Sequence, residues 1–133
     1  MAKLISSPQP SSLHRVSMNW KRLTDQVQLQ GIREASRNAE LSGIAIFKHS
    51  TRCSISSTAK ARIERSWNFD ETKLPIYYLD LLSYRHLSNQ VAAEFDVRHE
   101  SPQLLVIKNG ECVYHASHFG IDPREVEAAV SSD

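Results

Sequence analysis

Cys53 is the residue of this sequence best placed to do chemistry. It follows a short apolar run at 43–47 and precedes a stretch, 57–67, in which apolar residues recur at helical spacing. The sulfur is therefore expected where a strand passes through a tight loop into a helix. Backbone N–H groups at a helix start have no partner within the helix and the helix dipole is positive there, so both favour a thiolate over a thiol. This placement predicts a nucleophile that exchanges with disulfides.

The polar residues around Cys53 could assist such an exchange. Lys48 and Arg52 could stabilise the thiolate or meet an anionic group of a bound thiol. His49 could assist proton transfer, and Ser56, on the first helical turn, could donate its hydroxyl to the sulfur. Each also has an ordinary interpretation: solvated loop charges, a packing or surface histidine, and a helix N-terminal serine. Cys53 itself could be a small buried apolar residue.

A second thiol is missing from this motif, because the third residue after Cys53 is Ser56. A single thiolate can still attack a mixed disulfide, take over the low-molecular-weight thiol and release the partner protein reduced. Another thiol must then regenerate it. The other cysteine, Cys112, follows an Asn109–Gly110 turn, and the strand pair should separate it from Cys53 by roughly 15–20 Å at about 3.3 Å per residue. We expect Cys112 to pack in the structure rather than to resolve a disulfide.

Helices and strands are predicted in alternation along the chain. The expected elements, in chain order, are a weak strand within 16–23, a helix over 24–39 capped by Thr24–Asp25–Gln26, a strand at 44–47, a helix that begins at Cys53 and runs through 57–67, a strand at 76–82, a helix over 83–95, a hairpin of strands 104–107 and 112–115, and a last helix opened by Asp122–Pro123. This order implies parallel neighbouring strands joined by helical crossovers. We therefore expect an α/β fold with a central mixed sheet, flanking helices, and a C-terminal hairpin and helix.

Composition sets the broader class of the protein. A chain of 133 residues with 41% apolar content predicts one domain, over 16–133, behind a flexible tail at 1–15. Sixteen basic and fifteen acidic residues, without a basic block, argue against nucleic-acid binding. No apolar run approaches the length of a membrane span, and 1–10 lacks the apolar centre of a secretory signal. Together with only two distant cysteines, this predicts a cytoplasmic protein.

A metal site is not expected. His49 with Cys53 and His115 with His118 are the nearest pairs of metal-ligand type. Neither pair reaches the ligand number of a closed zinc site.

A Ser101–Pro102 dipeptide precedes the closing hairpin, and Cys53 lies at the first strand-to-helix corner. This arrangement resembles the thioredoxin-like fold. The resemblance covers nearly the whole chain after the tail. In that fold the proline at the place of Pro102 is cis and faces the active cysteine, and the residue before it offers backbone hydrogen bonds to a bound chain. The resemblance thus implies that Ser101 and Pro102 shape a substrate groove.

Within that fold, the segment 47–56, Phe-Lys-His-Ser-Thr-Arg-Cys-Ser-Ile-Ser, resembles the monothiol bacilliredoxins, the YtxJ-like proteins of the bacillithiol system. Members show Cys-Pro-Ile-Ser after a Lys-His-Ser lead. Ser54 stands where the family usually carries proline. Loss of proline at the first helical position frees an N–H group and changes the stiffness of the cap, so we expect a different redox poise with the same chemistry.

The resemblance implies a thiol–disulfide oxidoreductase that removes bacillithiol from S-bacillithiolated proteins by forming a mixed disulfide on Cys53. Bacillithiol would be the co-substrate, with no tightly bound cofactor. Cys53 and Ser56 would be catalytic, and the substrate contacts would be Lys48, His49, Arg52, Ser54, Ser101 and Pro102. The residues alone allow glutathione or coenzyme A equally, and leave the oligomeric state open. The alternatives are a glutaredoxin-like protein with another thiol or an iron–sulfur cluster, although the Gly and Phe of the Cys-Gly-Phe-Ser motif are missing, and a non-catalytic module that binds a partner beside Pro102.

Overall fold

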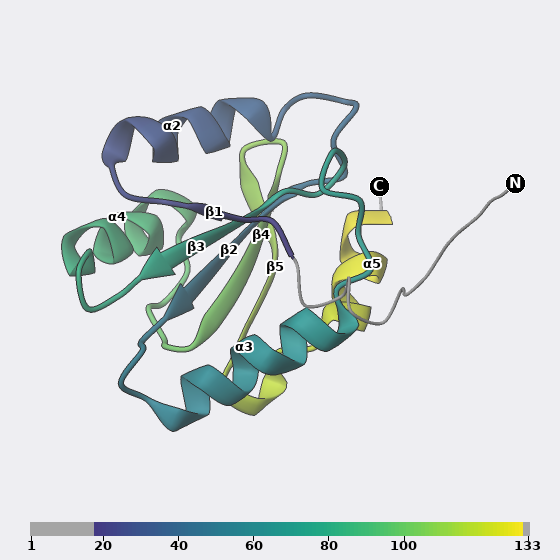
Figure 1. The fold of residues 1–133 in the computed structure, drawn as a ribbon. Coiled ribbons are helices and arrows are strands. Elements are labelled where there is room, and N and C mark those ends of the chain that lie inside the picture. The colour runs from purple at the N-terminus through teal and green to yellow at the C-terminus, as the bar shows by residue number, and fades with distance from the viewer. Residues whose placement is uncertain (1–17, 132–133) are drawn as a thin grey trace, which may run out of the picture.

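The computed structural model describes residues 18–131, so the tail predicted at 1–15 lies outside the described residues. A five-stranded sheet forms the centre, with the strand order β1-β3-β2-β4-β5 (Figure 1). The strands are β1 (Trp20–Arg22), β2 (Ile44–His49), β3 (Ile76–Asp80), β4 (Gln103–Lys108) and β5 (Glu111–Ser117). β1, β3 and β2 run parallel, whereas β4 and β5 are antiparallel to their neighbours. The expected mixed sheet is confirmed.

Helices cover both faces of this sheet (Figure 1). They are α2 (Gln26–Ala35), α3 (Ser54–Ser66), α4 (Arg85–Phe95) and α5 (Pro123–Ser131), with a short 3-10 turn, η1 (His118–Gly120). Helices α2 and α4 share one apolar core with one face of the sheet, and α3 and α5 share a second core with the other face. Within 18–131 no helix combines the length and the apolar character needed to cross a bilayer.

β2 lies in the middle of the sheet and all of its residues are buried. Side chains alternate between the faces of a strand, so Ile44 and Ile46 join the core under α2 and α4, while Ala45 and Phe47 join the core under α3 and α5. The strand extends two residues beyond the apolar run. Lys48 therefore points toward the α2–α4 side and His49 toward the α3 side.

Helix α2 ends at Ala35, so the predicted end at Ala39 is wrong. Ser36 is the C-cap residue, and its hydroxyl donates to the Arg33 carbonyl at 2.6 Å. The hairpin turn, which is distant in sequence, donates two hydrogen bonds to Ser36. Asn109 N–H donates to the Ser36 carbonyl at 2.8 Å, and Gly110 N–H donates to the Ser36 hydroxyl at 2.9 Å. The helix therefore ends where residues distant in sequence bond to it, and the local sequence around Ala35 gives no signal for this end. The predicted start is confirmed, since Asp25 caps α2.

The hairpin turn itself agrees with the sequence prediction. Asn109 and Gly110 both have positive φ, 57° and 78°, as a two-residue turn between right-twisted strands requires. The strands are longer than predicted by one or two residues at their ends. Their pairing brings Gln103 opposite Ser117, and thereby places the start of β4 and the end of β5 at the same edge of the sheet as the end of β2.

Candidate active site

Cys53 is the N-cap residue of α3, so the helix begins where the sequence predicts. Its backbone N–H donates to the Ser50 carbonyl at 3.1 Å, which closes the turn between β2 and α3. Its carbonyl accepts from Ser57 N–H at 3.1 Å and so starts the helical hydrogen-bond ladder. The Cys53 thiol is free and half-buried. The sulfur is therefore held by backbone geometry at the positive end of a helix of 13 residues.

Ser56 fastens the start of α3 to the end of β2. Its side chain is fully buried, and its hydroxyl accepts from Ser50 N–H at 3.0 Å. The same oxygen lies 2.6 Å from Nδ1 of His49. The Ser56 hydroxyl therefore bonds both to the last residue of β2 and to the loop that follows it, and so it fixes the turn that carries Cys53.

His49 completes this support from within the α3 side of the sheet. Its ring stacks on Phe47 at 5.6 Å between centroids and meets Tyr78 edge-on at 5.4 Å. Burial lowers the pKa of His49, and the charge of Lys60 lowers it further. The imidazole is therefore neutral near pH 7 and acts as a hydrogen-bond partner of Ser56 rather than as a positive charge.

Lys48 lies on the opposite face of β2 and is fully buried. Its Nζ donates to the Ser88 carbonyl of α4 at 3.2 Å and lies 3.1 Å from Nδ1 of His99. Neither partner is a carboxylate. Burial lowers the pKa of Lys48 to about 8. Burial also lowers the pKa of His99, and the charge of Lys48 adds to that effect.

The loop 98–102 forms the other side of the site. The Ser101–Pro102 peptide bond is cis, as the fold resemblance implied. Because Lys48 pairs with Gln103, Pro102 lies opposite His49, next to the turn that leads to Cys53. The Pro102 carbonyl accepts from His118 N–H at 3.0 Å, which joins η1 to the same edge.

The structure thus divides the residues predicted for the site. Arg52 and Ser54 are exposed beside Cys53, and Ser101 is half-buried in the neighbouring loop. The side chains of Lys48 and His49 point into the interior on opposite faces of β2. Sequence reasoning missed Ser88, His99 and Gln103, which surround the Lys48 ammonium or the loop behind it. Of these three, Gln103 could have been suspected, because it is a polar residue at the start of an apolar strand.

Cys112 lies at the far end of the sheet. It pairs with Ile107, which pairs with Ile44 at the start of β2, whereas Cys53 follows the end of that strand. Five residues of strand correspond to about 16 Å at roughly 3.3 Å per residue. Cys112 packs against the α2–α4 core, its Sγ donates to the Tyr114 carbonyl at 3.1 Å, and burial raises the pKa of its thiol. The predicted packing role is confirmed.

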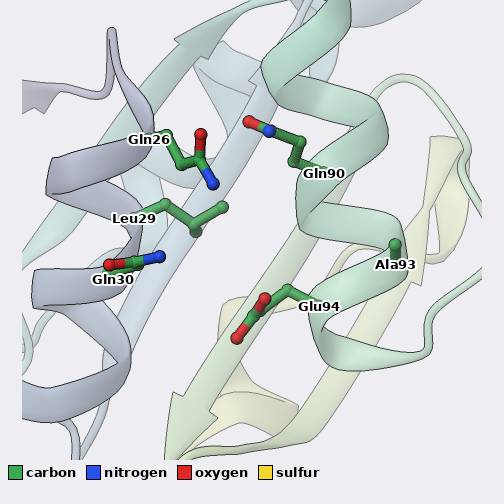
Figure 2. Close-up of a pocket in the computed structure, with 6 residues that line it drawn as sticks. All are labelled: Gln26, Leu29, Gln30, Gln90, Ala93 and Glu94. Atoms are coloured by element: carbon green, nitrogen blue, oxygen red, sulfur yellow. The ribbon is translucent and has the colours of Figure 1, made fainter.

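One further feature lies outside the thiol site. A groove between α2 and α4 is lined by side chains from both helices and does not include Cys53; Figure 2 shows Gln26, Leu29, Gln30, Gln90, Ala93 and Glu94 around it. The part of the chain described by the structure contains no cluster of three or more His, Cys, Asp or Glu side chains able to hold a metal ion.

Comparison with known proteins gives the same fold and a family. A family model described as "Monothiol bacilliredoxin BrxC" matches residues 21–126. A solved structure of a candidate oxidoreductase with a thioredoxin fold has 28% identity and a TM-score of 0.70, over 87% of this chain and 96% of that chain. The thioredoxin of Malassezia sympodialis has 16% identity and a TM-score of 0.62, over 86% of this chain and 90% of that one. The thioredoxin of Trypanosoma brucei brucei has 11% identity and a TM-score of 0.62, over 85% and 88%. The predicted thioredoxin-like fold is confirmed.

Proposed function

Since the chain belongs to the monothiol bacilliredoxin family, we propose that it is a thiol–disulfide oxidoreductase that removes bacillithiol from S-bacillithiolated proteins through Cys53. One observation carries this proposal: a free, half-buried cysteine is the N-cap residue of α3, at the same end of the sheet as the cis Ser101–Pro102 bond. The cysteine lies at the positive end of the helix dipole and is in part exposed to solvent, as a partner chain would require.

The reaction needs one sulfur of this protein. The Cys53 thiolate attacks the bacillithiol sulfur of the mixed disulfide, so that a new S–S bond forms and the bond to the substrate protein breaks. The electron pair leaves with the substrate cysteine, which takes up a proton from water. A second thiol from outside then attacks the adduct and regenerates Cys53. Cys112 is too far away to do this within the same chain.

The other site residues have three different tasks in this proposal. Arg52 and Ser54 contact the bacillithiol part of the substrate, because both are exposed beside the sulfur. The Ser101 backbone and Pro102 receive the protein part. Ser56 and His49 hold the Cys53 turn from behind.

A protein partner also agrees with the surface around the site. Ile55, on the first turn of α3, is 40% exposed, and Phe119 of η1 is 70% exposed. η1 is joined to Pro102 by the His118 hydrogen bond, so both apolar side chains belong to the edge that carries Cys53. Exposed apolar side chains at one edge suit a folded partner better than a free small thiol.

The test is mass spectrometry of the protein mixed with an S-bacillithiolated protein. We expect a bacillithiol adduct on Cys53 and a free thiol on the substrate. Cys112→Ala should behave as wild type, whereas Cys53→Ala should leave the substrate modified. Equal restoration by Cys53→Ala would refute the mechanism. Parallel reactions with glutathione and coenzyme A mixed disulfides identify the thiol, and faster removal of either than of bacillithiol would refute the substrate assignment.

A further inference from the structure

Lys48 has an environment that needs an explanation. It is one of six buried polar or charged residues in the described chain, and its ammonium has two polar partners, neither of them negative. Burial of an ammonium without a carboxylate costs free energy. The neighbouring positions on the same face of β2, Ile44 and Ile46, are apolar and join the core. An apolar side chain would suit position 48 as well, so the contribution of lysine lies in its hydrogen bonds.

These hydrogen bonds join three segments. Lys48 belongs to β2, the Ser88 carbonyl belongs to α4, and His99 belongs to the loop before Pro102. The Ser88 hydroxyl also lies 3.2 Å from Nδ1 of His99. Two polar groups thus hold the His99 ring from the inside of the molecule.

Gln103 adds a second attachment to the same loop. It is the strand partner of Lys48 and lies on the same face of the sheet. Its Nε2 donates to the Arg98 carbonyl at 2.9 Å. We call Lys48, Ser88, His99 and Gln103 the loop anchor, because together they hold both Arg98 and His99 against the sheet.

We propose that Lys48 is a positioning residue: through the loop anchor, it fixes the loop 98–101 in the shape that receives the substrate chain. Lys48 does this from the α2–α4 side of the sheet, away from the α3 side on which His49 and Ser56 support the Cys53 turn. The inference rests on the proposed function and assigns the two buried polar groups of β2 separate tasks. Lys48 shapes the surface that meets the partner, and His49 holds the turn that carries the nucleophile.

The test separates partner binding from sulfur reactivity. Lys48→Met keeps the length of the side chain and removes Nζ. We expect KM for an S-bacillithiolated protein to rise about tenfold, equivalent to about 1.4 kcal/mol and to the loss of one hydrogen bond from a charged donor. The rate of Cys53 alkylation by iodoacetamide, followed by peptide mass spectrometry, should stay within about twofold of wild type. A tenfold fall in the rate of Cys53 alkylation alongside the rise in KM, or an unchanged KM, would overturn the proposal.

Two further variants test whether Lys48 acts through His99 and whether the effect is specific to this position. His99→Ala removes the other end of the hydrogen bond at a half-buried position, so it should raise KM similarly, and the double variant should add little to either single change. Lys108→Met is the matched control, because Lys108 also donates to a backbone carbonyl, that of Val130 at 2.7 Å, at the far end of β4. Its KM should equal that of wild type. Additive effects of Lys48→Met and His99→Ala would contradict the loop anchor.

Hydrogen exchange tests the loop anchor even if the protein has a different substrate. The amides of 98–101 should exchange faster in Lys48→Met than in wild type, while those of β1 should not change. Unchanged exchange in the loop would refute the positioning role whatever the reaction is. Faster exchange in a protein that leaves bacillithiolated substrates untouched would retain the role of Lys48 and refute only the proposed function.

Discussion

Replacement of Lys48 by methionine should change how the stability of this protein depends on pH. The pKa of Lys48 falls from 10.5 to about 8 because the folded chain buries the ammonium. Between these values the unfolded chain binds more protons than the folded chain, so the free energy of unfolding rises with pH. Below pH 8 both states are protonated and the cost of the buried charge is present in full. The contribution therefore appears only as pH rises from 8 toward 10.5.

The size of this contribution follows from the shift. At about 1.4 kcal/mol per pKa unit, the difference in the free energy of unfolding between wild type and Lys48→Met should change by at most about 3.5 kcal/mol across that range. Because His99, next to the ammonium, is only half-buried, solvent screening should make the measured change smaller. Other groups that titrate above pH 8, such as Tyr78 and Cys112, are present in both proteins and cancel in the difference.

Urea unfolding at pH 7, 8, 9 and 10 measures the effect. We expect the stability of Lys48→Met, relative to wild type, to fall steadily above pH 8. Asp25→Ala is the control, because loss of the α2 cap should cost about 1 kcal/mol at every pH in this range. Parallel curves for wild type and Lys48→Met would refute the assignment of Lys48 as a buried ammonium with a lowered pKa.

Three further variants or measurements test the site and the fold. Ser56→Cys should form a disulfide with Cys53, because the N-cap and the third helical residue lie on the same side of the first turn; peptide mapping without reductant that finds both thiols free would contradict this. Burial raises the pKa of Cys112, so iodoacetamide at pH 7.5 should label Cys53 well before Cys112; equal labelling rates, measured on the separated peptides, would mean that Cys112 is open to solvent. Gly110→Ala should lower the free energy of unfolding by about 1 kcal/mol, because φ is 78° and a Cβ atom would lie 2.6 Å from Nη2 of Arg37; an unchanged urea midpoint would show that the turn tolerates the side chain.

The sequence was sufficient to predict most of the fold because most elements are defined by local patterns. The apolar run before Cys53, the Asn109–Gly110 turn and the Asp122–Pro123 helix start each contain their own signal. The end of α2 does not, because the groups that cap Ser36 come from the hairpin turn, 74 residues away for Gly110. Tertiary contacts therefore decide the boundary that local spacing predicts wrongly.

In the site, too, some positions follow from local sequence patterns and others depend on tertiary contacts. The position of Cys53 at a helix start follows from the strand and helix patterns on either side. The positions of Lys48 and His49 do not, because a charged or polar residue after an apolar run indicates a loop. Both lie in β2 because other segments supply their partners: Ser88 and His99 for Lys48, and Ser56 for His49. No spacing in the sequence predicts those pairs.

The separation of Cys53 and Cys112 along the length of the sheet limits the number of turnovers that one molecule can complete by itself. In the proposed reaction each chain accepts one adduct and then stops, since it holds no neighbouring thiol with which to discharge it. Purified protein alone would therefore clear substrate in a one-to-one ratio. Repeated turnover would depend on the rate at which an external thiol reduces the adduct on that single sulfur.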